Sequence, residues 1–341
     1  MDSLSGKRES SFAASSKMNF SRSLERRDKW AIILAGGDGS RLLSLTRKIA
    51  GDDRPKQFCP IIGGNTLLDE TRRRAALVLP PAETMFVLTQ KHERFYDTAL
   101  NGVPRGNLIV QPRNAGTAPA ILYSLLRLEQ INPHASAAFF PSDHYFSDDR
   151  AFMSEVESAF EFAGSNPNTV ILLGIEPDGA DEEYGWIEPA RETSTETPFR
   201  FRRVRRFWEK PSPALARELL TRGCLWNSFV MVGSVAAFLK MISRATSELY
   251  SKFSAVKATF STSCEKNAIE TLYAGLPDSN FSRDVLTTRT ENLAVVTVSG
   301  SKWSDLGSPR RVFSTLSNLG GTALIKRPPG GHLMRLPEAY L

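Results

Sequence analysis

The sequence is poor in cysteine and has no long hydrophobic run, and these two absences exclude several classes of protein. The three cysteines, Cys59, Cys224 and Cys264, lie far apart among 341 residues and form no CxxC pair. Their spacing argues against a disulfide framework and against a zinc site. No apolar stretch approaches the ~18 residues that a membrane span needs. The first residues also lack the apolar run of about 7–15 residues that marks a signal peptide, so we expect a cytoplasmic protein with no membrane partner.

The net charge of +6 is concentrated at the two ends of the chain. Residues 1–29 hold seven Lys or Arg against four Asp or Glu, and residues 322–341 hold three against one. The part between them is therefore nearly neutral, whereas binding to duplex nucleic acid needs clustered basic charge. We predict no nucleic-acid partner. We also predict a disordered tail at 1–29, one domain at 30–321 and a C-terminal tail at 322–341.

Apolar strand-like runs alternate with helical patterns from residue 30 onward. The runs WAIILAG, TMFVLTQ, NLIVQP, SAAFFPSD and TVILLGIEP are separated by segments with apolar residues at helical spacing. This alternation predicts an α/β fold, a Rossmann-like, mostly parallel twisted sheet with helices on both faces. The arginine-rich stretch FRFRRVRRF at 199–207 is interpreted as a solvated edge strand rather than as a nucleic-acid surface.

Glycines follow the first predicted strand in the stretch LAGGDGSRLLSLTRKIAGDDRPKQF, Leu34–Phe58. Glycines at a strand end let backbone N–H groups converge on an anion. The stretch is not a Walker A loop, because no Gly-Lys-Ser/Thr follows, and it lacks the third glycine of the dinucleotide fingerprint. Taken alone, it fits a phosphate site and a tight structural turn about equally.

Seven short motifs, in order from about residue 30 to 320, resemble those of the sugar-nucleotide pyrophosphorylases. The first, GGDGSRL followed by RPKQF, has the PKQF form of the mannose-1-phosphate guanylyltransferases. The others are QPRNAGTAPAI, PSDHYF, EYGWIEP, FWEKP, LWNSFVMVG and WSDLGS. The resemblance implies a GT-A-like nucleotidyltransferase fold. It also implies transfer of a nucleotidyl group from a nucleoside triphosphate, GTP being favoured, to a sugar-1-phosphate, mannose-1-phosphate being favoured, with Mg²⁺ as cofactor and pyrophosphate as the leaving group.

The same resemblance assigns a role to individual residues. The nucleotide is expected at Leu34, Ala35, Gly36, Gly37, Gly39, Ser40, Gln111, Arg113, Asn114 and Thr117. The sugar phosphate is expected at Gly185, Glu209, Lys210 and Asn227. The catalytic residues are expected to be Arg41, Lys56, Asp143 and Lys210, and the magnesium ligands Asp143 and Asp305.

The residues themselves leave other interpretations open. Asp143 and Asp305 each precede a predicted helix and also fit helix N-caps. Arg41 and Lys56 also fit exposed surface residues, and Glu209 with Lys210 fits a surface ion pair of little energetic value.

The motifs depart from the family pattern in several places. Ser40 replaces a threonine, LLSL replaces a proline-containing turn, and NSFV lacks the glycine that usually follows Asn-Ser. These departures leave two alternatives open, a non-catalytic regulatory relative that binds nucleotide or sugar phosphate and a pyrophosphorylase for another hexose. A homodimer also remains open.

Overall fold

A nine-stranded sheet forms the centre of the computed structural model, which describes residues 28–191, 200–319, 324–325 and 334–335. The strand order is β3-β2-β1-β4-β9-β6-β10-β8-β7, and in this sheet β8 and β9 run against the other seven strands. The predicted α/β sheet is confirmed and seven of its nine strands share one direction, but the pairing is mixed, with four parallel and five antiparallel pairs. Its strands are β1 (Lys29–Leu34), β2 (Thr84–Thr89), β3 (Leu108–Gln111), β4 (Ser136–Pro141), β6 (Val170–Ile175), β7 (Gly185–Pro189), β8 (Phe201–Glu209), β9 (Leu225–Ser234) and β10 (Leu293–Val298).

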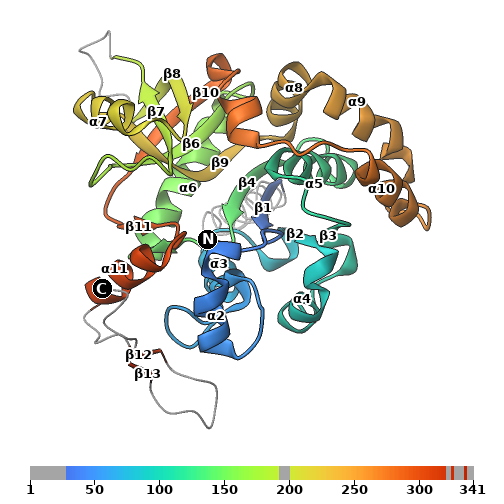
Figure 1. Ribbon diagram of the computed structural model, residues 1–341. Coiled ribbons are helices and arrows are strands. Elements are labelled where there is room, and N and C mark those ends of the chain that lie inside the picture. The colour runs from blue at the N-terminus through green and yellow to red at the C-terminus, as the bar shows by residue number, and fades with distance from the viewer. Residues whose placement is uncertain (1–27, 192–199, 320–323, 326–333, 336–341) are drawn as a thin grey trace, which may run out of the picture.

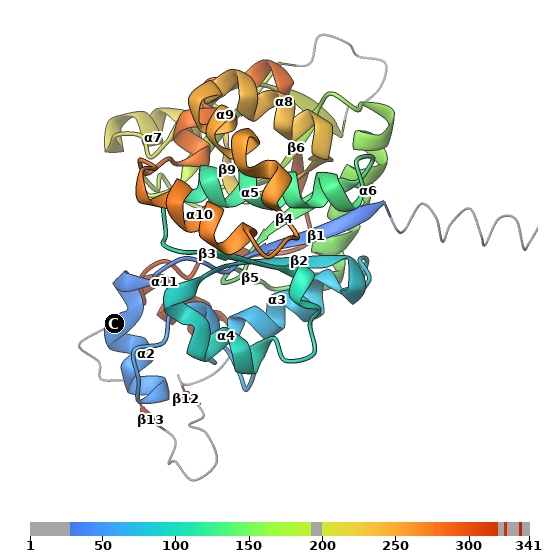
Figure 2. The ribbon, with the colours of Figure 1, turned by 90° about the vertical axis from the view of Figure 1, so that its right-hand side faces the viewer.

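Helices cover both faces of this sheet. Figure 2 shows β1, β2 and β3 running between α5 and α10 on one side and α3 and α4 on the other. The helices are α2 (Leu43–Ala50), α3 (Leu67–Ala75), α4 (Glu93–Ala99), α5 (Thr117–Ile131), α6 (Asp149–Ser165), α7 (Pro213–Thr221), α8 (Val235–Ala245), α9 (Ser247–Val256), α10 (Glu265–Ala274) and α11 (Pro309–Asn318). Among the described residues, none of the helices has the length and apolar character to cross a bilayer.

The strands bury both of their faces, so the core has two main layers. Ile32 of β1 packs in the layer that contains α5, α8, α9 and α10. Its neighbours Ala31 and Ile33 pack in the other layer, with α3, α4, α6 and α7. Successive side chains of a strand point to opposite faces, which explains why these strands read as continuous apolar runs.

A smaller core joins the first and last parts of the chain. In it Leu42, before α2, packs with Leu306 and with Val312 of α11. Two short strands, β5 (Tyr145–Phe146) and β11 (Trp303–Ser304), pair antiparallel and bring the C-terminal segment to the end of β4 (Figure 1). Residues distant in the sequence therefore meet beside the glycine-rich stretch.

The arginine-rich stretch is exposed to solvent as predicted, at Arg203, Arg205 and Arg206, but its position at a sheet edge was predicted wrongly. β8 lies between β10 and β7, pairing through its first residues with β10 and through the rest with β7. Ion pairs compensate some of the charge here, since Arg205 pairs with the buried Glu188 at 3.1 Å and Arg200 pairs with Glu155.

The predicted tails fall almost wholly outside the described residues. Within the C-terminal one, β12 (Leu324–Ile325) pairs antiparallel with β13 (Met334–Arg335).

Candidate active site

A cavity of about 330 Å³ opens at the carboxyl ends of β1 and β4. Ligands of open α/β sheets bind at this end of the strands. The cavity brings together eleven of the residues that the sequence predicts for the site: Leu34, Gly36, Gly37, Gln111, Asn114, Thr117, Asp143, Gly185, Glu209, Asn227 and Asp305.

A second, smaller hollow adjoins the first. It is lined by Gly39, Ser40, Arg41 and Lys56, and it shares Asp143 with the main cavity. Gly39 and Ser40, predicted to bind the nucleotide, and Arg41 and Lys56, predicted to be catalytic, thus share a compartment next to one of the two aspartates. Ala35, Arg113 and Lys210 line neither hollow.

The glycine loop approaches its neighbours so closely that side chains would not fit. A Cβ on Gly36 would lie 2.9 Å from Thr89 Oγ1 and 3.0 Å from Gln111 Nε2. Gly39 adopts φ +59°, in the left-handed region that glycine reaches without strain. The side chain of Gln57 then fixes the loop, donating from Nε2 to the carbonyl oxygens of Ala35 and Gly37 at 3.0 and 2.8 Å.

Asp143 and Asp305 approach the site from segments 162 residues apart in sequence, and neither caps a helix. The N-caps of α6 and α11 are Asp148 and Ser308. The Lys56 ammonium joins the two aspartates. Its Nζ lies 3.3 Å from Asp143 Oδ2 and donates to the carbonyl oxygen of Asp305 at 2.7 Å.

The Asp305 carboxylate is held by several donors. Oδ1 accepts from the Tyr184 hydroxyl at 3.2 Å and from the Gly307 N–H at 2.9 Å, and Arg311 Nη1 reaches both oxygens at 3.2 and 3.1 Å. Burial alone would raise the pKa of Asp305, but nearby positive charge lowers it below its usual range. Burial also lowers the pKa of His144 to about 4, so that imidazole is neutral at pH 7. The charge acting on Asp305 at that pH therefore comes from Arg311 and Lys56.

The residues of this site fit a magnesium ion that is shared with a phosphate ligand. No cluster of three or more His, Cys, Asp or Glu side chains suited to a metal occurs among the described residues. Two carboxylates, Asp143 and Asp305, still line the same cavity. Mg²⁺ typically binds to one or two carboxylates and completes its shell with substrate phosphates and water.

The other side of the cavity is formed by β7, β8 and β9. Gly185 pairs with Glu209 across β7 and β8, and a Cβ on Gly185 would lie 2.8 Å from Phe207 Cζ and 3.2 Å from Glu209 Oε2. Burial raises the pKa of Glu209, against the charge of Lys210 and a hydrogen bond with Ser282. Asn227 is buried, and its Oδ1 accepts from the backbone N–H of Phe229 at 3.1 Å.

A family model described as Nucleotidyl transferase matches residues 30–319. The chain belongs to the nucleotidyl transferase family. The match covers the whole nine-stranded sheet except Lys29 at the start of β1, together with both hollows.

Curated relatives of the chain include an alginate biosynthesis protein and a mannose-1-phosphate guanylyltransferase. The chain is 27% identical over 282 residues to the alginate biosynthesis protein AlgA of Pseudomonas aeruginosa, covering 81% of this chain and 56% of that one. It is 28% identical over 230 residues to mannose-1-phosphate guanylyltransferase 2 of Escherichia coli O157:H7, covering 64% and 46%. The chain thus spans about half the length of the curated relatives that it matches.

A solved structure confirms the nucleotidyl transferase fold. The crystal structure of a mannose-1-phosphate geranyltransferase from Thermus thermophilus superposes with a TM-score of 0.73 at 29% identity. The match covers 84% of this chain and 79% of that one. The predicted GT-A-like nucleotidyltransferase architecture is therefore shown by sequence and by structure.

Arg113, which the sequence predicts to bind the nucleotide, does not line the cavity. Its guanidinium donates to the carbonyl oxygen of Tyr273 at 3.2 Å and to Asp278 Oδ1 at 2.9 Å, and it also binds the carbonyl oxygen of Leu276. Arg113 therefore anchors the segment after α10, whose residue Asn280 lines the cavity.

Five residues that contact the candidate site were not predicted from the sequence. Gln57, Asp181, Glu183, Tyr184 and Arg311 contact predicted site residues directly or through one intermediary. Gln57 lies inside the RPKQF motif and Tyr184 inside the EYGWIEP motif, so the sequence could have indicated that both lie near the site. Arg311 lies in a helix whose sequence carries no motif, and no local pattern indicates its contact with Asp305.

Proposed function

We propose that this nucleotidyl transferase domain transfers the guanylyl group of GTP to mannose-1-phosphate, forming GDP-mannose and pyrophosphate. One observation carries the proposal: a single cavity joins the glycine loop, two aspartates and the Gly185–Glu209–Asn227 wall. In this proposal the triphosphate lies against the glycine loop and the aspartates, and the sugar phosphate lies against the Gly185–Glu209–Asn227 wall. The choice of GTP and mannose follows the names of the relatives and the PKQF motif.

The reaction is a displacement at phosphorus. A phosphate oxygen of the sugar-1-phosphate attacks the α-phosphorus of the nucleotide, and the bond from that phosphorus to the α–β bridging oxygen breaks as pyrophosphate leaves. Such a step depends on positioning and on neutralising charge more than on covalent help from the protein. The residues of the two hollows supply both.

The glycine loop and Arg41 would hold the triphosphate. The Arg41 side chain is 57% exposed, and among the described residues it forms one ion pair, to Glu183 Oε2 at 3.1 Å. A pair this exposed is weak, so a phosphate can replace the carboxylate and use the planar fork of the arginine. Lys56, by contrast, is already bound to Asp143 and to the carbonyl of Asp305, so in this proposal it positions the two aspartates.

Asp143 and Asp305 would hold Mg²⁺ together with phosphate oxygens of the nucleotide. The ion, when bound, neutralises charge that develops on the phosphates during transfer. The aspartates fix where that charge is neutralised, at the boundary between the small hollow and the main cavity.

Glu209 and Asn227 would bind the sugar hydroxyls, and the backbone at Gly185 would lie against the ring. Lys210 follows Glu209 with φ +49° and an exposed side chain. Because its side chain lines neither hollow, we propose that it reaches the sugar phosphate from the rim of the cavity.

The base would lie against Gln111, Asn114 and Thr117. The Gln111 amide is fixed on both sides, accepting from the Tyr273 hydroxyl at 3.1 Å and donating to the carbonyl of Leu88 at 3.3 Å. A fixed amide presents one orientation of donor and acceptor to a base, which supports selection among purines.

A matrix of nucleoside triphosphates against sugar-1-phosphates, read by pyrophosphate release, tests the proposal. We expect the highest kcat/KM for GTP with mannose-1-phosphate. Loss of an outer partner of a metal ligand costs about 10–100-fold, so loss of the ligand in Asp143→Asn should cost more than about 100-fold. Circular dichroism would verify that this variant is folded.

Two results would contradict the proposal. Tight binding of GTP without turnover on any sugar phosphate would favour a regulatory relative. Faster turnover with another pair of substrates would contradict the choice of GTP and mannose-1-phosphate but would support nucleotidyl transfer as the reaction.

A further inference from the structure

Three carboxylates surround the guanidinium of Arg311 at the edge of the site. Arg311 Nη2 donates to Asp181 Oδ2 at 2.6 Å, and Nη1 lies 3.1 Å from Glu183 Oε2 and from Asp305 Oδ2. The Arg311 side chain is 14% exposed. We call Asp181, Glu183 and Asp305 the acidic corner, and Arg311 is the cation within it.

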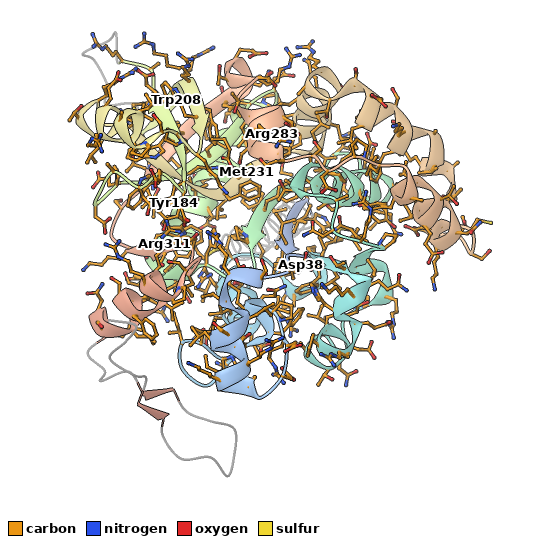
Figure 3. The ribbon with its side chains drawn as sticks, viewed as in Figure 1. Asp38, Tyr184, Trp208, Met231, Arg283 and Arg311 are labelled. Carbon is orange, nitrogen blue, oxygen red and sulfur yellow. The ribbon has the colours of Figure 1, made fainter. Side chains whose placement is uncertain are left out.

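The fold builds this arrangement from two separate segments. Arg311 lies in the first turn of α11, where the Ser308 side chain caps the helix and accepts from the Arg311 N–H at 3.4 Å. The guanidinium lies over the ring of Tyr184, 4.1 Å from its centroid, and Figure 3 shows the two side chains next to each other. A cation over an aromatic face is attracted by the ring, so the Tyr184 ring holds the Arg311 guanidinium in addition to the three carboxylates.

The 181–184 segment is ordered by its own hydrogen bonds. Asp181 Oδ1 accepts from the Glu183 N–H at 2.8 Å, and the Asp181 carbonyl accepts from Trp186 Nε1 at 2.8 Å. The two acidic side chains are thereby placed before any ligand is present. Without a cation between them and Asp305, three like charges would face one another.

As they stand, with the guanidinium between them, these carboxylates form no metal cluster among the described residues. Without the guanidinium they would attract a divalent cation, because grouped carboxylate oxygens suit hard cations. The guanidinium occupies the space between the three carboxylates. It carries one positive charge, stays protonated and is covalently attached to the chain, so it cannot leave as a metal ion can. Its Nη1 also contacts both oxygens of Asp305, which is the carboxylate expected to bind the metal.

We propose that Arg311 is a built-in counter-cation, which holds the Asp305 carboxylate in place and prevents the acidic corner from binding a divalent cation before the nucleotide arrives. This inference rests on the proposed function, in which Asp305 is a metal ligand. In this view Asp143 and Asp305 would hold Mg²⁺ only together with the triphosphate, whose oxygens would be further ligands. Glu183 extends the arrangement to the glycine loop, since its Oε2 accepts from Arg41 and from Arg311 at 3.1 Å each.

The test measures binding of Mn²⁺ to the nucleotide-free protein by the electron paramagnetic resonance signal of the free ion. Arg311→Met removes the charge and Arg311→Lys keeps it without the planar fork. Arg310→Met is the matched control, because Arg310 is the exposed neighbour on the same helix. Removing a unit charge next to a metal ligand should tighten Mn²⁺ binding by about 10-fold or more in Arg311→Met. The lysine and control variants should stay within about 3-fold of the wild type.

Adding Asp305→Asn to Arg311→Met should abolish the gain. Mn²⁺ binding in Arg311→Met no tighter than in the wild type would overturn the inference, as would a gain that survives Asp305→Asn. If Arg311→Met fails to fold, Arg311→Gln makes the same charge change with a polar side chain and is judged by the same outcomes.

This measurement needs no turnover, so its outcome is independent of the test of the proposed function. An inactive wild-type enzyme with tighter Mn²⁺ binding in Arg311→Met would refute the proposed reaction while the counter-cation stands. Active enzyme with unchanged binding would refute the counter-cation alone.

Discussion

Four non-glycine residues in the described part of the chain have a positive φ, and three of them line the cavity or directly follow a residue that does. Lys210 has φ +49°, Phe229 +60° and Leu306 +47°. Lys210 directly follows Glu209, and Leu306 directly follows Asp305. Phe229 lines the cavity itself. Such conformations cost about 1–3 kcal/mol and persist where the surroundings impose them. Here the strain is located where the backbone must turn to present site residues.

Phe229 allows this strain to be measured. Both Phe229→Gly and Phe229→Ala remove the ring, which packs edge-on against Phe281. Glycine adopts φ +60° freely, whereas alanine keeps the clash of a Cβ. We expect the glycine variant to be more stable than the alanine variant by about 1 kcal/mol, as measured by urea unfolding.

Arg203, at an exposed position of β8, provides a control at which the expected order of stability of the alanine and glycine variants is reversed. Arg203 lies in regular strand, so Arg203→Ala should be at least as stable as Arg203→Gly, because glycine loses more backbone freedom on folding. Equal stability of Phe229→Gly and Phe229→Ala would show that φ at this position relaxes without cost.

At the scale of elements, the sequence predicts the regular parts of the fold well and the contacts of single long side chains poorly. Apolar runs identify the strands, because a strand that is buried on both faces has apolar side chains at consecutive positions. Helical spacing of apolar residues identifies the helices that cover them. The position of β8 inside the sheet was missed, since its arginines pair with carboxylates such as Glu188 from other segments. Arg113 and Arg311 likewise bind groups more than a hundred residues away.

The start of α5 is an element boundary whose geometry constrains the base side of the cavity. Gly116 has φ +91°, and a Cβ there would lie 2.2 Å from the carbonyl oxygen of Ser279. The same carbonyl accepts from the Ala118 N–H at 3.1 Å, and Thr117 Oγ1 accepts from the Phe281 N–H at 2.8 Å. The 279–281 segment is thus attached directly to the first turn of α5.

Gly116→Ala should push this segment away from α5. We expect a loss of at least about 2 kcal/mol in the free energy of unfolding, from overpacking together with the positive φ. The KM for nucleotide should also rise, because Asn280 and Gly116 itself line the cavity. Urea unfolding and steady-state kinetics would measure the two effects.

Gly106→Ala is the matched control for this substitution. No atom lies within 4 Å of a Cβ at Gly106, so its stability should stay within about 1 kcal/mol of the wild type and its KM should not change. A Gly116→Ala variant that behaves like Gly106→Ala would show that the 279–281 segment moves without cost.

At the scale of the whole molecule, the site is closed by contacts between the first and last parts of the chain. The core of Leu42, Leu306 and Val312, the pairing of β5 with β11, and the ammonium of Lys56 all link the 303–319 segment to the glycine loop and to β4. The site is therefore complete when the C-terminal segment is docked. Lys56 is the polar member of this set.

Lys56 and Arg41 lie in the same hollow and should separate in their effects on stability. The Lys56 side chain is 11% exposed and its ammonium serves Asp143 and the carbonyls of Asp305 and Leu306. Lys56→Met would leave these acceptors unpaired, so we expect a loss of about 3 kcal/mol in the free energy of unfolding. Arg41→Met breaks one exposed pair and should cost less than about 1 kcal/mol.

Both variants should lower kcat/KM for nucleotide, Lys56→Met through displaced aspartates and Arg41→Met through a lost phosphate contact. Denaturant unfolding of the two proteins, alongside their kinetics, would measure this separation. Equal losses of stability would mean that Lys56, like Arg41, is held loosely in the absence of nucleotide. The C-terminal segment would then depend on its apolar contacts, on the pairing of β5 with β11 and on the ion pairs of Arg311.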